Sequence, residues 1–222
     1  ELSMGVQPRR GLREQVAKRL RLAIATEKFP AGARLIEREL CEMMGVSRTS
    51  LREALRELQA DGLITLQPNK GLSVSTVSLD TARSIYEVRA MLEGLAARLF
   101  ARNRTPAQMT ALRDSVDRLA EVYSDFSAEA FIAAKTQFYD ILLEGAGNPV
   151  AADMLRRIHT RVSQLRVVSL SSAERAQQSI RELREFLDAL EARDEERAWQ
   201  VCVAHVEAAA TAALKTMAAD KG

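Results

Sequence analysis

Apolar residues return at helical spacing near the beginning of the chain, on either side of a short polar break. Between positions 36 and 44 they fall at i, i+4, i+7 and i+8, which is typical of a helix with one buried face. Gly45, which can adopt a left-handed turn, and Ser47, which can cap the next helix, follow. The second helix would bury Leu51, Leu55 and Leu58. The pattern therefore predicts a helix-turn-helix.

A strand pair is expected directly after this motif. Asp61 and Gly62 would end the second helix, and residues 63–66 then alternate as in a short strand. The stretch 67–71 has the composition of a turn, and residues 72–75 read as the returning strand. With a first helix over residues 12–26, these elements predict a winged helix-turn-helix with a small β-hairpin wing.

The remainder of the chain shows helical spacing and no strand pattern. Helices are expected over residues 80–101, 105–123, 127–145, 149–168, 171–193 and 194–217. The predicted fold is therefore mostly α, with a C-terminal all-helical bundle. We expect a flexible basic tail over residues 1–10, a winged-helix DNA-binding domain over 11–77 and a helical domain over 78–222.

Charge and composition support this division. The 222 residues carry a net charge of +2, but residues 1–75 alone hold 13 basic and 9 acidic side chains, as expected for a DNA-binding module. Two cysteines do not make a disulfide framework. No apolar run is long enough for a membrane span, and we expect a cytoplasmic protein. No nucleophilic triad, phosphate-binding loop or inward carboxylate pair is found, so an enzyme is not expected.

The segment GVSRTSLREALRELQADGLI, followed by the turn NKG, resembles the DNA-binding domain of the GntR family of bacterial transcription regulators. The resemblance covers residues 12–76 and implies binding to double-stranded DNA. Arg48 and Arg52 lie in the first turns of the second helix, where such a helix meets base edges. The other residues expected at the DNA are Arg38, Ser47, Thr49 and the wing residues Lys70 and Gly71.

The helical part resembles the FCD domain, the effector-binding domain of the FadR-like subgroup of this family. The segments that carry the resemblance are YEVRAMLEGLAARL, FYDILLEGAGNP and REFLDALEARDEERAWQVCVAHV. It covers residues 78–213. The resemblance implies a homodimeric regulator, most often a repressor, that binds a palindromic operator and responds to a small molecule in the helical domain.

Many FCD domains bind a divalent metal with one aspartate and three histidines, and this chain departs from that pattern. The first three ligand positions hold Lys135, Tyr139 and Leu183, and only His205 matches. Lysine carries a positive charge and leucine cannot bind a metal, whereas zinc requires at least three protein ligands. We therefore expect no metal cofactor.

These replacements suggest a different ligand. Arg89, Lys135, Tyr139, Leu183 and His205 fall on inward-facing helical stripes, and buried cations require an anionic partner. We expect that partner to be a small organic anion. Two alternatives remain open at this point. The partner is an internal acid, for which the candidates are Glu93, Asp140 and Glu182, or the helical domain serves dimerisation only and binds no effector.

Overall fold

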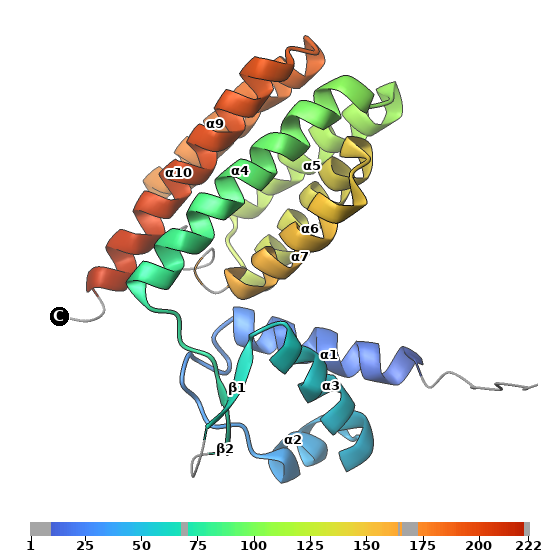
Figure 1. The fold of residues 1–222 in the computed structure, drawn as a ribbon, viewed down its shortest axis with the longest axis vertical. Helices are drawn as coiled ribbons and strands as arrows, with labels where there is room; N and C mark the ends of the chain where they lie inside the picture. The colour runs from blue at the N-terminus through green and yellow to red at the C-terminus, as the bar shows by residue number, and fades with distance from the viewer. Residues whose placement is uncertain (1–9, 68–70, 164, 166–172, 220–222) are drawn as a thin grey trace, which may run out of the picture. The chain divides into compact units, whose positions relative to one another are not determined.

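The computed structural model describes residues 10–67, 71–163, 165 and 173–219. The chain divides into two compact units, residues 1–76 and residues 77–222 (Figure 1). Each unit has its own apolar core. The fold class predicted from the sequence, a winged helix-turn-helix followed by a helical bundle, is confirmed.

The N-terminal unit contains three helices and one hairpin. The helices are α1 (Arg10–Ala25), α2 (Glu37–Met44) and α3 (Arg48–Ala60), and the strands are β1 (Ile64–Gln67) and β2 (Gly71–Val74). Gly45 ends α2 with a positive φ of 65°, a backbone conformation that favours glycine. The two predicted helices of the motif and the predicted wing are thus present in the predicted order.

The wing is tied to the rest of its unit through the backbone. Strands β1 and β2 are antiparallel, with Ile64 opposite Val74 and Leu66 opposite Leu72. The amide of Leu35 donates to the carbonyl of Leu72 at 2.8 Å. Since Leu35 lies two residues before α2, this bond fixes the wing next to the helix-turn-helix.

The C-terminal unit is a bundle of long helices (Figure 1). They are α4 (Leu79–Asn103), α5 (Pro106–Ser124), α6 (Ala128–Ala146), α7 (Pro149–Arg161), α9 (Ala173–Glu191) and α10 (Glu195–Ala219). Four of them begin at a side-chain cap, namely Ser78, Thr105, Ser127 and Asn148, because each cap oxygen accepts from an otherwise unpaired amide of the first turn. Helix α7 ends at Arg161, earlier than the sequence predicted, and the expected cap at residues 171–172 lies outside the described residues.

Helices α4 and α10 lie side by side along most of their length and also pack against other helices of the bundle. Gly94 permits their close approach, because a Cβ atom there would stand 2.6 Å from the Trp199 ring. The main core cluster lies between α4, α5, α6, α7, α9 and α10 and includes Phe100, Phe131 and Leu190. No described helix is long and apolar enough to cross a membrane.

Candidate functional site: an exposed basic helix and a buried polar interior

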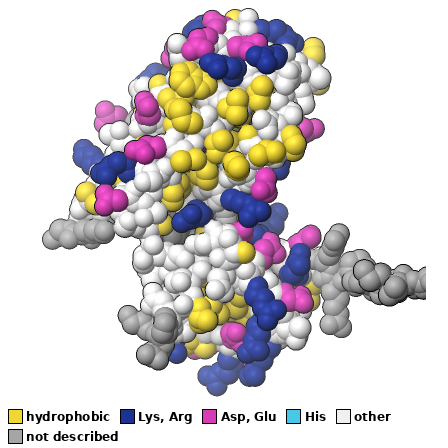
Figure 2. All heavy atoms as spheres, in the orientation of Figure 1, with side chains coloured by type: hydrophobic (Ala, Val, Ile, Leu, Met, Phe, Trp, Pro, Cys, Tyr) yellow, Lys and Arg dark blue, Asp and Glu magenta, His cyan; other side chains and the backbone are white. Residues whose placement is uncertain are grey.

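Helix α3 presents a polar face because its apolar face is used for packing. Leu51, Ala54, Leu55 and Leu58 are all buried. The side chains of Arg48, Thr49 and Arg52 point the other way and are exposed. Figure 2 shows Lys and Arg side chains gathered over the part of this unit where Figure 1 places α2 and α3.

Ser47 fixes the first turn of α3. Its hydroxyl oxygen accepts a hydrogen bond from the amide of Ser50 at 3.3 Å and lies 3.1 Å from the Ser50 hydroxyl. The cap therefore fixes the N-terminus of α3. The positive end of the helix dipole faces outward there, an arrangement that suits a phosphate group. Arg48 is the first residue of that helix.

Two of the arginines expected at DNA contact acids of α2. Arg52 donates through Nε to both carboxylate oxygens of Glu37, at 3.1 and 2.9 Å. Arg38 lies 4.0 Å from Glu42, one turn further along α2. The Arg38–Glu42 pair is exposed and the Arg52–Glu37 pair is partly exposed. Such ion pairs are weak, so neither pair prevents the arginine from meeting DNA.

Of the two wing residues expected at the DNA, the structure describes only Gly71. Gly71 begins β2 with a positive φ of 77° and has open space around its Cα. Lys70 lies outside the described residues.

Arg89 of the helical unit has an internal carboxylate as its partner. Its Nε donates to Glu93 Oε1 at 2.5 Å, and its Nη2 donates to the Tyr139 hydroxyl at 3.0 Å. Tyr139 in turn donates to Glu93 Oε2 at 3.0 Å, and His159 Nε2 lies 2.7 Å from Glu93 Oε1. We refer to Arg89, Glu93, Tyr139 and His159 as the Glu93 cluster. Burial alone would lower the pKa of Arg89, but the Glu93 carboxylate raises it, so Arg89 keeps its charge.

A second acid holds His205. Glu182 Oε2 lies 2.6 Å from His205 Nδ1 and accepts from Arg175 Nη2 at 3.0 Å. Burial would raise the pKa of Glu182, yet the hydrogen bonds from His205 and Arg175 lower it to about 2. Burial lowers the pKa of His205 to about 4, despite the favourable contact with Glu182. We refer to Arg175, Glu182 and His205 as the Glu182 cluster.

Lys135 is buried beside aromatic rings. Its residue is only 6% exposed, and its ammonium nitrogen lies 5.5 Å from the centre of the Phe138 ring and 5.9 Å from that of the Tyr139 ring. Ring faces are electron-rich and attract a cation at this distance. The rings therefore stabilise part of its charge inside the bundle.

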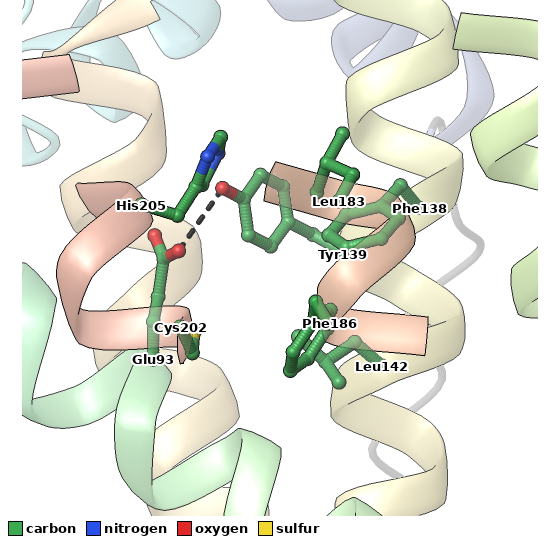
Figure 3. A pocket seen from close by; sticks show the side chains of 8 residues that line it. All are labelled: Glu93, Phe138, Tyr139, Leu142, Leu183, Phe186, Cys202 and His205. Carbon is green, nitrogen blue, oxygen red and sulfur yellow. Dashed lines mark hydrogen bonds between the residues drawn. The ribbon is translucent and has the colours of Figure 1, made fainter. Parts of the chain in front are cut away.

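A small cavity lies between the two clusters (Figure 3). The volume of the cavity that is open to water is about 10 Å³. This is roughly the room that one water molecule needs. Glu93, Tyr139 and His205 supply its polar wall. The apolar wall consists of Phe138, Leu142, Leu183, Phe186 and Cys202.

The structure brings Tyr139, Leu183 and His205 to one cavity. Arg89 lies next to it through Tyr139, and Lys135 is not among the residues that line it. Sequence reasoning gave no role to His159 and did not consider Arg175. Glu93 carried a usable signal, since it follows Arg89 by four residues and therefore shares its helical face. His159 carried no comparable signal, because its contact with Glu93 joins α7 to α4.

The donor set around the cavity does not suit a metal. Lys135 and Leu183 offer no metal-binding atom. Among the described residues, no group of three His, Cys, Asp or Glu side chains is placed to hold an ion. Burial raises the pKa of the Cys202 thiol, which keeps it protonated and a poor nucleophile.

The depressed pKa of His205 predicts how the stability of the helical unit depends on pH. The unfolded chain binds a proton at His205 near pH 6.5 and the folded chain only near pH 4. Stability is therefore full above pH 6.5 and decreases as the pH falls from 6.5 to 4, by about 3 kcal/mol. Glu182, whose pKa is also lowered, adds a further loss between pH 4.5 and 2. Urea unfolding of the wild type and of His205→Gln from pH 7 to 4 measures this effect.

The glutamine retains a donor for Glu182 but does not titrate, so its curve should be flatter between pH 6.5 and 4. Parallel curves for the two proteins would show that His205 is not the group responsible.

Comparison with known proteins agrees with the division into a winged-helix unit and a helical unit. The family model "Bacterial regulatory proteins, gntR family" matches residues 12–74, and the model "FCD domain" matches residues 84–208. A relative from Paenarthrobacter nicotinovorans, "Probable D-xylose utilization operon transcriptional repressor", is 30% identical over 92% of both chains. The Bacillus subtilis regulator YdhC, an uncharacterized HTH-type protein, is 25% identical over 86% of both.

Solved structures show the same fold. McbR/YncC from E. coli superposes with a TM-score of 0.79 at 23% identity, covering 89% of this chain and 94% of that one. A GntR regulator from Rhodococcus sp. RHA1 gives 0.76 at 24% identity, covering 91% and 97%. The chain therefore belongs to the GntR family of bacterial transcriptional regulators, with a GntR DNA-binding domain followed by an FCD domain, and it is not an enzyme.

Proposed function

We propose that this regulator binds a palindromic DNA operator as a homodimer, acts as a repressor in the cytoplasm, and changes its DNA affinity when a small organic anion enters the helical unit. The observation that carries the proposal is the exposed polar face of α3, on which Arg48, Thr49 and Arg52 lie in the first two turns after the Ser47 cap. Arginine is the side chain best suited to guanine in the major groove. The repressor role is supported by the name of the Paenarthrobacter relative.

An exposed apolar stripe supports the dimer. Val88, Met91 and Leu95 of α4 are 52%, 50% and 36% exposed, and Val150 and Met154 of α7 are 64% and 49% exposed. Figure 2 shows apolar side chains gathered over the part of the unit where Figure 1 draws α4 and α7. Their spacings place them on one face of each helix, and α4 packs against α7. A contiguous apolar surface of this kind marks a protein interface.

The proposed effector is supported by buried polar groups inside the helical unit. Arg89 Nη1 is buried without a hydrogen-bond partner among the described residues, and a buried donor of this kind is costly unless a ligand or water satisfies it. Lys135 adds a second buried cation, and Tyr139 adds a hydroxyl that faces the cavity. A carboxylate with an apolar body suits this combination of buried cations and apolar lining residues. Because the cavity has room for about one water, such a ligand enters only if the lining side chains move apart.

A second candidate is favoured by one specific contact. Glu93 already neutralises Arg89, which is the internal partner that the sequence left open. If Lys135 is satisfied internally as well, the helical unit serves dimerisation alone and the protein is a DNA-binding regulator without an effector. The effector experiment below separates the two candidates.

Arg52→Ala should weaken binding to the operator by about 1–3 kcal/mol and relax its sequence preference. The reason is that an arginine at a base edge contributes discrimination, whereas one at a phosphate contributes only affinity. The measurement is fluorescence anisotropy with a duplex selected by the wild-type protein and with a scrambled duplex. Arg56→Ala, one turn further along the same exposed face, is the matched control for loss of charge. Equal losses on both duplexes for Arg52→Ala would show a phosphate contact only.

Met91→Glu should convert the dimer into a monomer. It would place a charge in the centre of the α4 stripe, which must lose water when two copies associate. Sedimentation velocity at micromolar concentration measures the outcome. Ala133→Glu, at an exposed position of α6, adds the same charge outside the stripe and should stay dimeric. A wild type that sediments as a monomer would contradict the dimer itself.

Lys135→Ala should weaken effector binding by roughly ten- to a hundredfold, because one charge-assisted contact is worth about 1.5–3 kcal/mol. Thermal shift with benzoate, octanoate and lactate, with and without a chelator, identifies an acid class that stabilises the wild type. Acids with an apolar body should act more strongly than lactate. Gln137→Ala, exposed on the same helix, is the control. If no carboxylate stabilises the wild type, or if Lys135→Ala responds like the wild type, the structural alternative holds.

A further inference from the structure

The side chain of Arg52 is held in a specific way by Glu37, the first residue of α2. Both Glu37 oxygens accept from the same donor, Arg52 Nε, at 3.1 and 2.9 Å. The side chain of Glu37 is 30% exposed and that of Arg52 is 59% exposed. The acid therefore lies nearer the protein and the guanidinium extends outward from it.

This contact uses only part of the guanidinium. The two terminal groups, Nη1 and Nη2, form no hydrogen bond with any residue that the structure describes. Guanine presents two acceptors in the major groove, O6 and N7, and an arginine reads them with two parallel N–H donors. With Nε occupied, the remaining pair of donors is Nη1 and Nη2, at the outer end of the side chain.

Glu37 also has an unfavourable effect on DNA binding in general. A carboxylate beside the reading helix repels the phosphate backbone, and this repulsion does not depend on sequence. Against this, an arginine that is already oriented loses less freedom when it binds. The same acid should therefore lower affinity for arbitrary DNA and raise discrimination between sequences.

We infer that Glu37 is a positioning residue that sets the sequence specificity of this regulator without touching a base: it holds Arg52 through Nε so that the Nη1 and Nη2 groups read a guanine end-on. The inference rests on the proposed operator binding and adds the residue that determines how Arg52 reads the site.

The test compares Glu37→Gln with Glu39→Gln. Both acids lie in the first turn of α2, where an acid stabilises the helix through its dipole, and both substitutions remove one negative charge. Glu39 is exposed and forms no ion pair with a described residue. The two variants therefore differ in the contact with Arg52 and share the general effects.

The probes are a duplex selected by the wild-type protein from a randomised library, the same duplex with each G·C pair replaced in turn, and a scrambled duplex. Binding is measured by fluorescence anisotropy at one fixed salt concentration. Both variants should bind the scrambled duplex at least as tightly as the wild type. For Glu37→Gln the ratio of selected to scrambled affinity should fall roughly tenfold, concentrated at one G·C pair. For Glu39→Gln the ratio should stay unchanged.

In an Arg52→Ala background, Glu37→Gln should leave the ratio unchanged, because the side chain that it positions is gone. Glu37→Asp retains the charge at the helix end but is one methylene shorter, so its ratio should lie between those of wild type and Glu37→Gln. It also provides the measurement if circular dichroism shows that Glu37→Gln does not fold.

The inference is overturned if Glu37→Gln and Glu39→Gln keep the same ratio, or if Glu37→Gln weakens both duplexes equally. Failure of the wild type to select any sequence is a different result, since it would contradict the proposed operator binding itself.

Discussion

The buried carboxylate of Glu93 is the contact on which the interior of the helical unit depends. Removing a carboxylate or a guanidinium from water costs several kcal/mol, and that loss is offset only by close, hydrogen-bonded partners. Glu93 has three such partners, Arg89 from its own helix, Tyr139 from α6 and His159 from α7. The cluster therefore links α4 to the consecutive helices α6 and α7 and fixes the position of Tyr139 at the cavity. Lys135 lies near the Tyr139 ring, and His205 lies at the same cavity as Glu93 and Tyr139.

The same interior explains why the departure from the metal pattern is tolerated. A metal brings positive charge that aspartate and histidine ligands neutralise, whereas here the positive charge is supplied by the side chains of Arg89, Lys135 and Arg175. Glu93 and Glu182 accept from two of these cations. His205 keeps its position through Glu182, and burial keeps it neutral at neutral pH. The unit thus has a polar centre built from paired cations and acids.

The sequence predicted the fold well because local signals were strong and agreed with one another. The glycine after α2 and the serine cap of α3 each mark a helix terminus by a mechanism that acts within a few residues. The inward position of Tyr139, Leu183 and His205 followed from helical spacing alone. The pairing of buried charges did not, because Glu93 with His159 and Glu182 with His205 are contacts between helices. Spacing shows which face a residue occupies, but not which residue of another helix it meets.

Two arginine–glutamate pairs illustrate how burial decides what an ion pair can do. Arg52 with Glu37 is exposed, so water screens the attraction and a base or phosphate can compete for the free end of the guanidinium. Arg89 with Glu93 is almost completely buried, with side-chain exposures of 3% and 2%, so only a group that brings its own negative charge could replace Glu93 without leaving a cation unpaired. Under the proposed function, the exposed pair leaves the terminal groups of Arg52 open to a DNA base. Under the proposed function, the buried pair would favour an anion over a neutral molecule, because only an anion could take the place of the carboxylate.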